Sequence, residues 1–197
     1  MRGTASLERS KADRQASTSG SARPAWDTYF MRMAVLAASR STCLRRQVGA
    51  VIVKAHMVLS TGYNDTPRGL PNCGEGGCAR CASDAPAGVG LDACYCLHAE
   101  QNAIIQAAYH GVAIAGATMY ATHQPCLTCA KMIVNVGIRR LVFAGDYPDP
   151  LALEMLQRAE VVLERVAADS AATSPERVGS RAAQDTHGVE RQEPKGI

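Results

Sequence analysis

Two stretches, His98-Ala99-Glu100 and Pro125-Cys126-Leu127-Thr128-Cys129, decide the interpretation of this 197-residue chain. Each one opens a segment whose apolar residues have helical spacing. Because the two cysteines of the second stretch lie three residues apart on a helix, their thiols point the same way and can reach one metal ion. The histidine of the first stretch supplies a third ligand. Three protein ligands with an open fourth position are typical of a catalytic zinc ion.

Glu100 lies two residues after His98 and projects in a different direction, so we expect it to move protons rather than bind zinc. Taken alone, His98 is better explained as a hydrogen-bonded core histidine, and the cysteine pair as a redox pair or half of a structural zinc site. Together, at two turns into helices, the motifs form the H-x-E…P-C-x-x-C signature of zinc-dependent deaminases. In the predicted reaction, zinc-bound hydroxide attacks an amidine carbon while Glu100 carries protons to the ring nitrogen and the departing ammonia.

Outside these motifs, apolar spacing and β-rich runs predict a hairpin followed by alternating helices and strands. The expected helices span residues 26–40, 98–109, 126–136 and 150–158, and the expected strands span residues 48–54, 57–63, 117–122, 139–144 and 161–166. This order predicts an α/β fold with three layers, α/β/α, around a mixed five-stranded sheet.

One domain is expected over residues 24–167, between two segments, 1–23 and 168–197, that we expect to be disordered tails. The apolar stretches are strand-sized, which predicts no membrane-spanning segment. The N-terminal segment is basic but lacks the apolar core of a secretory signal, so we expect a cytoplasmic protein, with an organellar transit peptide as the alternative. The central part is nearly neutral, which argues against a nucleic-acid partner.

Residues 26–166 resemble the deoxycytidylate (dCMP) deaminase family, and the bacterial late-competence and fungal branches are the most similar in pattern. The matching motifs are Trp26-Asp27-Thr28-Tyr29-Phe30-Met31, Gln47-Val48-Gly49-Ala50-Val51-Ile52-Val53, Gly62-Tyr63-Asn64, His98-Ala99-Glu100-Gln101-Asn102-Ala103-Ile104, Pro125-Cys126-Leu127-Thr128-Cys129-Ala130-Lys131 and Asn135-Val136-Gly137-Ile138. The resemblance implies a cytidine-deaminase-like fold and hydrolysis of dCMP to dUMP and ammonia, which supplies thymidylate synthesis. It also implies a homohexamer, with dCTP and dTTP as effectors in regulated members.

The resemblance also assigns roles to individual residues. It implies that His98, Cys126 and Cys129 bind the catalytic zinc, that Glu100 transfers protons, and that Asn64, Ala99, Tyr147 and Arg68 contact the substrate. The amide of Asn64 is expected to bind a sugar hydroxyl, unless this is an ordinary turn asparagine, and Tyr147 to cover the substrate, unless it is an exposed loop tyrosine. Arg68 is the preferred contact for the phosphate, and the other candidates are Arg45, Arg46 and Lys131.

Two positions depart from the family pattern. Many relatives have Leu-Phe before Pro-Cys, whereas this chain has His123-Gln124, so a base-stacking aromatic residue is absent at position 124. The family's Gly-Tyr-Asn-Gly turn ends here in Asp65, and that turn is linked to dCTP activation and dTTP inhibition. An acidic side chain there would repel phosphates or help to hold magnesium, which leaves allosteric control open.

Six further cysteines accompany an irregular segment, residues 64–97, whose order needs an explanation. A secreted disulfide framework is disfavoured without a signal peptide, and metal ligation would offset the entropy cost of ordering so long a loop. The pattern is similar to the second, structural zinc site of several dCMP deaminases. The expected ligands are Cys73, Cys78, Cys81 and Cys96, with Cys94 or Cys43 able to replace one of them. Reduced thiols, some of them buried, are the alternative.

Three other functions stay open on the sequence alone. One is a deaminase of another cytosine compound, such as the nucleoside, dCTP or single-stranded DNA, although DNA binding would favour a basic, aromatic groove. Another is a non-catalytic zinc-binding module, which would be expected to lose Glu100 or a ligand. The third is a redox protein that uses Cys126 and Cys129.

Overall fold

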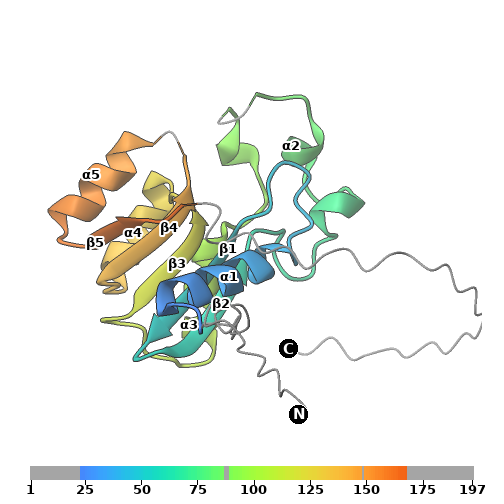
Figure 1. Cartoon of the computed structure of the whole chain (residues 1–197). Coiled ribbons are helices and arrows are strands. Elements are labelled where there is room, and N and C mark those ends of the chain that lie inside the picture. The colour runs from blue at the N-terminus through green and yellow to red at the C-terminus, as the bar shows by residue number, and fades with distance from the viewer. Residues whose placement is uncertain (1–22, 87–88, 148, 168–197) are drawn as a thin grey trace, which may run out of the picture.

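The structure is a computed structural model that describes residues 23–86, 89–147 and 149–167. The predicted tails, residues 1–23 and 168–197, lie outside this part of the chain except for residue 23. The elements are α1 (Trp26–Ala38), β1 (Gly49–Lys54), β2 (Met57–Tyr63), η2 (Cys73–Glu75), α2 (Ala79–Ala82), η3 (Leu91–Ala93), α3 (Ala99–Tyr109), β3 (Thr118–His123), α4 (Leu127–Asn135), β4 (Arg140–Gly145), α5 (Pro150–Arg158) and β5 (Val162–Arg165). These elements confirm the predicted α/β class (Figure 1).

The sheet is mixed and has five strands in the order β2-β1-β3-β4-β5. β1 pairs antiparallel with both β2 and β3, whereas β3, β4 and β5 run parallel. Ala55 and His56 form the two-residue hairpin turn between β1 and β2, and both have positive φ angles, 48° and 62°. A turn of this hand matches the twist of the flanking strands, so it fixes the hairpin register even without glycine.

The two faces of the sheet bury alternate residues of the strands, as the period of a strand requires. One face packs on α1, and its buried side chains are Phe30, Met31, Ala34, Val51, Val53, Tyr120, Val142 and Ala144. The other face packs on α3, α4 and α5 through a larger apolar cluster that contains Ile52, Met119, Leu141, Ile133 and Leu156. The sheet therefore lies between two helical layers, which confirms the α/β/α arrangement.

α3 lies unusually close to β2, and glycine makes this approach possible. A Cβ atom added to Gly62 would lie 2.2 Å from the carbonyl oxygen of Ala99 and 2.4 Å from the amide nitrogen of Ala103. No side chain fits into this space, so the backbone of the first turn of α3 rests directly on the strand. His98 directly precedes that turn.

The expected irregular segment contains the short helices η2, α2 and η3, and it forms a small lobe beside the sheet (Figure 1). Its buried cluster consists of Cys73, Cys78 and Cys81, and the partly buried hydrophobic residues packed against them are also cysteines. The guanidinium of Arg45 donates hydrogen bonds to the carbonyl oxygens of Ser83 and Ala85 and so joins the lobe to the chain that follows α1.

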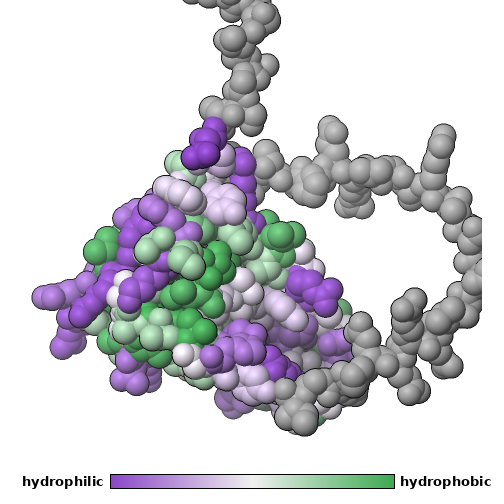
Figure 2. All heavy atoms as spheres, turned by 90° about the horizontal axis from the view of Figure 1, so that it is seen from below, coloured by the Kyte–Doolittle hydropathy of each residue, from purple (hydrophilic) through white to green (hydrophobic). Residues whose placement is uncertain are grey.

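One face of the molecule carries a group of hydrophobic side chains surrounded by polar ones (Figure 2). Exposed apolar residues occur on three neighbouring elements, as shown by Leu36 of α1, Met57 of β2 and Ile105 of α3. Among the helices of the described residues, none combines the length and apolar character needed to cross a membrane.

Candidate metal centre and substrate pocket

His98, Cys126 and Cys129 converge on one point although they are far apart in the sequence. His98 Nδ1 lies 3.4 Å from Cys126 Sγ and 3.4 Å from Cys129 Sγ. Tetrahedral zinc with its usual bonds to nitrogen and sulfur separates such atoms by about 3.6 Å. Because two thiols and an imidazole are also ligands that zinc prefers, the three residues fit a zinc ion, and they leave one tetrahedral position for a non-protein ligand.

Two helix N-termini place these ligands. His98 is the N-cap of α3, and its backbone N–H donates to Oε1 of Gln101 at 2.7 Å. Cys126 is the N-cap of α4, so both predicted helices begin one residue later than the sequence pattern indicated. The positive ends of the two helix dipoles point toward the thiols and favour their thiolate forms.

The thiol pair is polarised before any metal binds. Hydrogen bonds from Cys129 and His98 lower the pKa of Cys126 to about 4, in spite of its burial. The hydrogen bond with Cys126, together with burial, raises the pKa of Cys129. The hydrogen bond with Cys126 also raises the pKa of His98. The three side chains therefore favour a thiolate at the partly buried Cys126, which attracts a cation.

Glu100 lies beside the ligands and is not one of them. Its residue is 3% exposed, and its carboxyl group shares a hydrogen bond with the thiol of Cys129. Burial raises the pKa of Glu100, which brings the carboxyl group nearer to the range in which it can both accept and release a proton. The group of converging ligand atoms contains His98, Cys126 and Cys129 without this carboxylate.

A cavity of about 460 Å³ opens onto this centre, and Glu100 is among its lining residues. The size suits a small molecule such as a nucleotide. The predicted substrate contacts Asn64, Ala99 and Tyr147 line the cavity, as do Arg45 and Arg46. The structure thus brings most of the residues selected from the sequence together in one cavity, around the candidate metal ligands.

Arg68, the preferred phosphate contact, is not among the residues that line this cavity in the described part of the chain. Its guanidinium donates to Oε1 of Gln106 at 2.9 Å and lies 5.3 Å from the ring centre of Tyr109, on the outer surface of α3. Lys131 is exposed on α4 and is also outside the lining residues.

Arg46 differs from the other two arginines that line the cavity in the partners of its guanidinium. The guanidinium of Arg80 donates to the carbonyl oxygens of Pro86 and Val89, and that of Arg45 is bound to loop carbonyls as well. No acceptor is found for the Arg46 guanidinium among the residues that the structure describes. Its charge, together with burial, lowers the pKa of His123.

Asn64 uses half of its amide to fix the turn that holds it. Its Oδ1 accepts from the backbone N–H of Val48 at 2.7 Å, and its Nδ2 donates to the carbonyl oxygen of Arg46 at 2.8 Å. An amide has two donor hydrogens and two acceptor lone pairs, so one of each is not used by these two bonds.

Asp65 does not face outward as a separate charge. Its carboxylate accepts hydrogen bonds from the backbone N–H groups of Thr42 and Thr66 and from the hydroxyl of Thr42. The Thr42 hydroxyl oxygen accepts in turn from the N–H of Cys73. These bonds outweigh burial and lower the pKa of Asp65, so the departure from the family pattern serves to join three loops.

Four polar lining residues were not selected as site residues from the sequence: Arg80, His123, Gln124 and Asp149. Gln124, where many relatives have an aromatic residue, donates through Nε2 to the carbonyl oxygen of Asp149 at 3.0 Å. Asp149 could have been found, because an aspartate directly before Pro150 is a common start of a helix. Arg80, His123 and Gln124 come from separate segments of the chain, and no local sequence pattern indicates that these segments meet.

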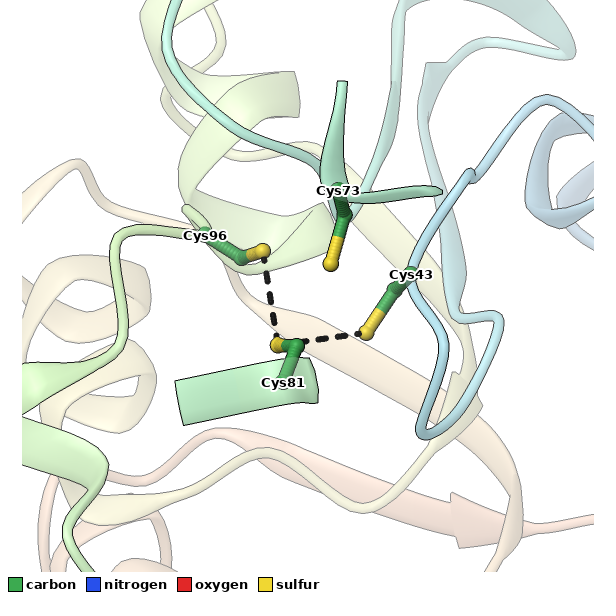
Figure 3. Close-up of side chains that lie close together, drawn as sticks. All are labelled: Cys43, Cys73, Cys81 and Cys96. Carbon is green, nitrogen blue, oxygen red and sulfur yellow. Dashed lines mark hydrogen bonds between the residues drawn. The ribbon is translucent and has the colours of Figure 1, made fainter. Parts of the chain in front are cut away.

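The six other cysteines converge in the lobe, and their sulfur atoms form two overlapping groups. One group contains Cys43, Cys73, Cys81 and Cys96 (Figure 3), and the other contains Cys78, Cys81, Cys94 and Cys96. The four ligands expected from the sequence are therefore divided between the groups, and both substitutes that the sequence allowed, Cys43 and Cys94, take part.

Comparison with known proteins agrees with this geometry. Residues 24–145 match the family described as the cytidine and deoxycytidylate deaminase zinc-binding region. A deoxycytidylate deaminase of Schizosaccharomyces pombe is 48% identical over 144 residues, which cover 73% of this chain and 44% of that protein. ComE operon protein 2 of Bacillus subtilis is 39% identical over 152 residues, which cover 75% of this chain and 74% of that protein. The chain thus spans less than half the length of the fungal relative and most of the bacterial one.

Solved structures extend the agreement to the whole fold. The dCMP deaminase of the cyanophage S-TIM5, in complex with dCMP and dUMP, is 33% identical with a TM-score of 0.61, and the match covers 73% of this chain and 98% of that one. The family match, the relatives and this fold confirm the resemblance that the motifs indicated: the chain belongs to the cytidine and deoxycytidylate deaminase family.

Proposed function

We propose that this protein hydrolyses dCMP to dUMP and ammonia. One observation carries the proposal: the buried carboxyl group of Glu100 lies against the thiol of Cys129, at a three-ligand metal centre inside a cavity of nucleotide size. The names of the fungal relatives and the nucleotides bound in the cyanophage structure support dCMP as the substrate. The activity makes the protein a hydrolase that acts on a cyclic amidine and supplies dUMP for thymidylate synthesis.

The residues of the centre divide the chemical work. A zinc ion held by His98, Cys126 and Cys129 supplies Lewis-acid activation of water near neutral pH. Glu100 accepts a proton from the attacking water and delivers it to the ring nitrogen next to C4. Glu100 then takes the proton of the new C4 hydroxyl group and passes it to the amino group, so that the C4–N bond breaks, a C4 carbonyl forms and ammonia leaves.

Burial suits Glu100 to this double role. A carboxyl group with a raised pKa is a stronger base than an ordinary carboxylate, so it accepts the proton of the activated water and holds it until it is passed to the substrate. The backbone of Ala99, which is fully buried between His98 and Glu100, lines the cavity and gives the pyrimidine ring a flat contact.

The sugar and the phosphate face the opposite wall. The free donor and acceptor of the Asn64 amide bind a sugar hydroxyl, and Tyr147 covers the ring from the loop after β4. Arg46 binds the phosphate, because its guanidinium is the lining arginine that is not committed to loop carbonyls in the described residues. This assignment replaces Arg68 as the preferred phosphate contact.

A homo-oligomer, most simply the hexamer that the family resemblance implies, completes the proposal. The hydrophobic side chains grouped on one face (Figure 2) provide a surface that a second copy would bury. Binding of dCTP or dTTP is part of this proposal, with the turn around Asp65 as the element that an effector would move. All eight cysteines are free thiols, which supports a reducing compartment such as the cytoplasm.

The six-cysteine lobe holds structural zinc in this proposal. Its buried cluster is built from cysteines, and metal ligation is the interaction that would order it. The lobe contributes Arg80, Cys81 and Cys94 to the lining of the substrate cavity. Structural metal here would therefore hold one wall of the site in place.

The test offers the purified protein dCMP, deoxycytidine, dCTP and a cytosine oligonucleotide, and measures ammonia release from each. We expect strong preference for dCMP, and a Glu100→Gln variant as the matched control should release almost none. Activity confined to another cytosine compound would preserve the chemistry and overturn the substrate. Inactivity toward all four with zinc bound would replace the proposal with a non-catalytic zinc-binding module, and disulfide-dependent activity without zinc with a redox protein.

A further inference from the structure

The two cysteine groups of the lobe have two members in common, and a sulfur atom that belongs to two groups can bridge two metal ions. Cys81 and Cys96 belong to both groups, whereas Cys43 and Cys73 belong to one and Cys78 and Cys94 to the other. Within each group all the sulfur atoms lie within 4.8 Å of one another. Six sulfurs thus mark the corners of two tetrahedra that share an edge.

The sulfur–sulfur distances have the length that such an edge requires. Cys81 Sγ lies 3.8 Å from Cys43 Sγ, 3.7 Å from Cys94 Sγ and 3.8 Å from Cys96 Sγ, and Cys78 Sγ lies 3.8 Å from Cys94 Sγ. Tetrahedral zinc with bonds to sulfur of about 2.3 Å separates its sulfurs by about 3.8 Å. A disulfide would bring two sulfurs to about 2.05 Å.

We propose that the lobe binds two zinc ions in a binuclear Zn₂Cys₆ cluster, in which the thiolates of Cys81 and Cys96 bridge the ions. Cys43 and Cys73 complete one tetrahedron, and Cys78 and Cys94 complete the other. The chain then carries three zinc ions, one catalytic and two structural. This deepens the structural-zinc part of the proposed function and is independent of the substrate.

A single ion would leave the geometry unexplained. One zinc takes four thiolates, so an ion among Cys43, Cys73, Cys81 and Cys96 would leave Cys78 and Cys94 side by side without a ligand role. Cys78 is fully buried, and its sulfur accepts a hydrogen bond from the backbone N–H of Tyr95 at 3.4 Å, as a metal-bound thiolate commonly does. A second ion gives this sulfur the same role as the others.

The charge of the lobe also suits two ions. Six thiolates and two divalent ions leave two negative charges, and three arginines, Arg45, Arg46 and Arg80, line the neighbouring cavity. Cys81 bears the shortest contacts to members of both groups, which is the position of a bridging sulfur.

The cluster would connect three separate parts of the chain to the catalytic centre. Cys43 follows α1, Cys73 to Cys81 span η2 and α2, and Cys96 lies two residues before the zinc ligand His98. Since the buried cluster of the lobe is built of cysteines, loss of the ions would release a wall of the cavity and the approach to His98 together.

The test counts metal in the full chain with the catalytic site removed. A His98→Ala/Cys126→Ala double variant, purified with zinc and assayed by elemental analysis with circular dichroism as a check of folding, should hold two zinc ions per chain. The unaltered chain should hold three. One ion in the double variant and two in the unaltered chain would overturn the binuclear cluster, as would iron in place of zinc.

A second measurement begins with the unaltered chain and then compares two variants with it. The unaltered chain loaded with ¹¹³Cd should give two resonances from all-thiolate sites, split by coupling through the shared sulfurs. A single such resonance, or two without coupling, would exclude bridging. Cys81→Ser should lose both signals or their coupling, whereas Cys43→Ser should keep the signal of the Cys78/Cys94 site. Deaminase activity enters neither readout, so failure of the proposed function leaves these results unchanged.

Discussion

Asp149 caps the helix that carries Cys129: its Oδ2 accepts a hydrogen bond from the backbone N–H of Leu127 at 2.8 Å. The other oxygen of the same carboxylate accepts from the N–H of Ala152, 3.2 Å away, in the first turn of α5. One side chain therefore satisfies the N-termini of two helices, α4 and α5. Leu127 follows the candidate metal ligand Cys126 directly, so this cap bears on the candidate metal centre as well as on the helix pair.

Replacing Asp149 by alanine should lower the free energy of unfolding by about 2 kcal/mol, since each lost cap costs roughly 1 kcal/mol. Urea unfolding measures the change, and zinc affinity should fall with it. Asp146→Ala is the matched control, because Asp146 forms an exposed ion pair with Arg165 that contributes less than about 1 kcal/mol. Equal losses in the two variants would contradict the capping role.

Glu100→Gln should keep the zinc and lose at least about a hundredfold in turnover, because the amide fills the same space but cannot transfer protons. Ammonia release and elemental analysis on the same preparation measure the two quantities. Cys129→Ala is the complementary variant, and it should release the catalytic zinc. Normal turnover in Glu100→Gln, or unchanged zinc in Cys129→Ala, would show that these roles are assigned wrongly.

Arg46→Met should raise the KM for dCMP by about 10- to 100-fold, the worth of a charged hydrogen bond to phosphate. The KM for deoxycytidine, which has no phosphate, should stay within about twofold of the unaltered protein. Arg32→Met removes an exposed arginine of α1 and serves as the control for net charge. A parallel rise for both substrates would assign Arg46 to the structure of the loop instead of phosphate binding.

The stability of the fold should depend on pH through Arg140, which forms ion pairs with Asp27 and Glu164. Hydrogen bonds from Arg140 hold the pKa of both carboxyl groups below their ordinary values. The unfolded chain therefore binds more protons in the acid range, so this stabilisation is present above the ordinary carboxyl pKa and is lost as the pH falls through the lower folded values.

Asp27→Asn tests this dependence. The unaltered protein should be more stable than the variant at pH 7, by no more than about 1 kcal/mol because the pair is partly exposed, and the difference should shrink toward pH 3. Urea unfolding across this range provides the measurement. Glu154→Gln, in the exposed pair with Arg158, is the control and should cost only a few tenths of a kcal/mol. A difference that grows in acid would reverse the sign argued here.

The convergence of the candidate metal ligands could be predicted because the sequence information for it is local. Cys126 and Cys129 are fixed by helix geometry, and His98 and Glu100 by the first turn of another helix. The alternation of the strands was equally readable, so the sheet and its layers followed. Arg46 could be named only as one of several phosphate candidates, and His123 and Gln124 could not be assigned to the cavity, because these residues meet only after separate segments of the chain come together. The division of the cysteines into two groups also depends on loop paths that no spacing determines.

The close approach of α3 to β2 provides the last prediction. Gly62→Ala would place a methyl group 2.2 Å from the Ala99 carbonyl oxygen, and the backbone of α3 must move to admit it. We expect a loss of about 1–3 kcal/mol in unfolding free energy, as for other overpacked sites, and weaker binding of zinc because His98 moves with the helix.

Gly74→Ala is the matched control, since a methyl group there would meet only the Thr42 carbonyl oxygen at an ordinary 3.6 Å. Urea unfolding and zinc titration of both variants decide the matter. If Gly62→Ala were as stable as Gly74→Ala and bound zinc equally well, the contact between β2 and α3 would not be what positions His98. Loss of stability with unchanged zinc affinity would separate the packing of the helix from the placement of its metal ligand.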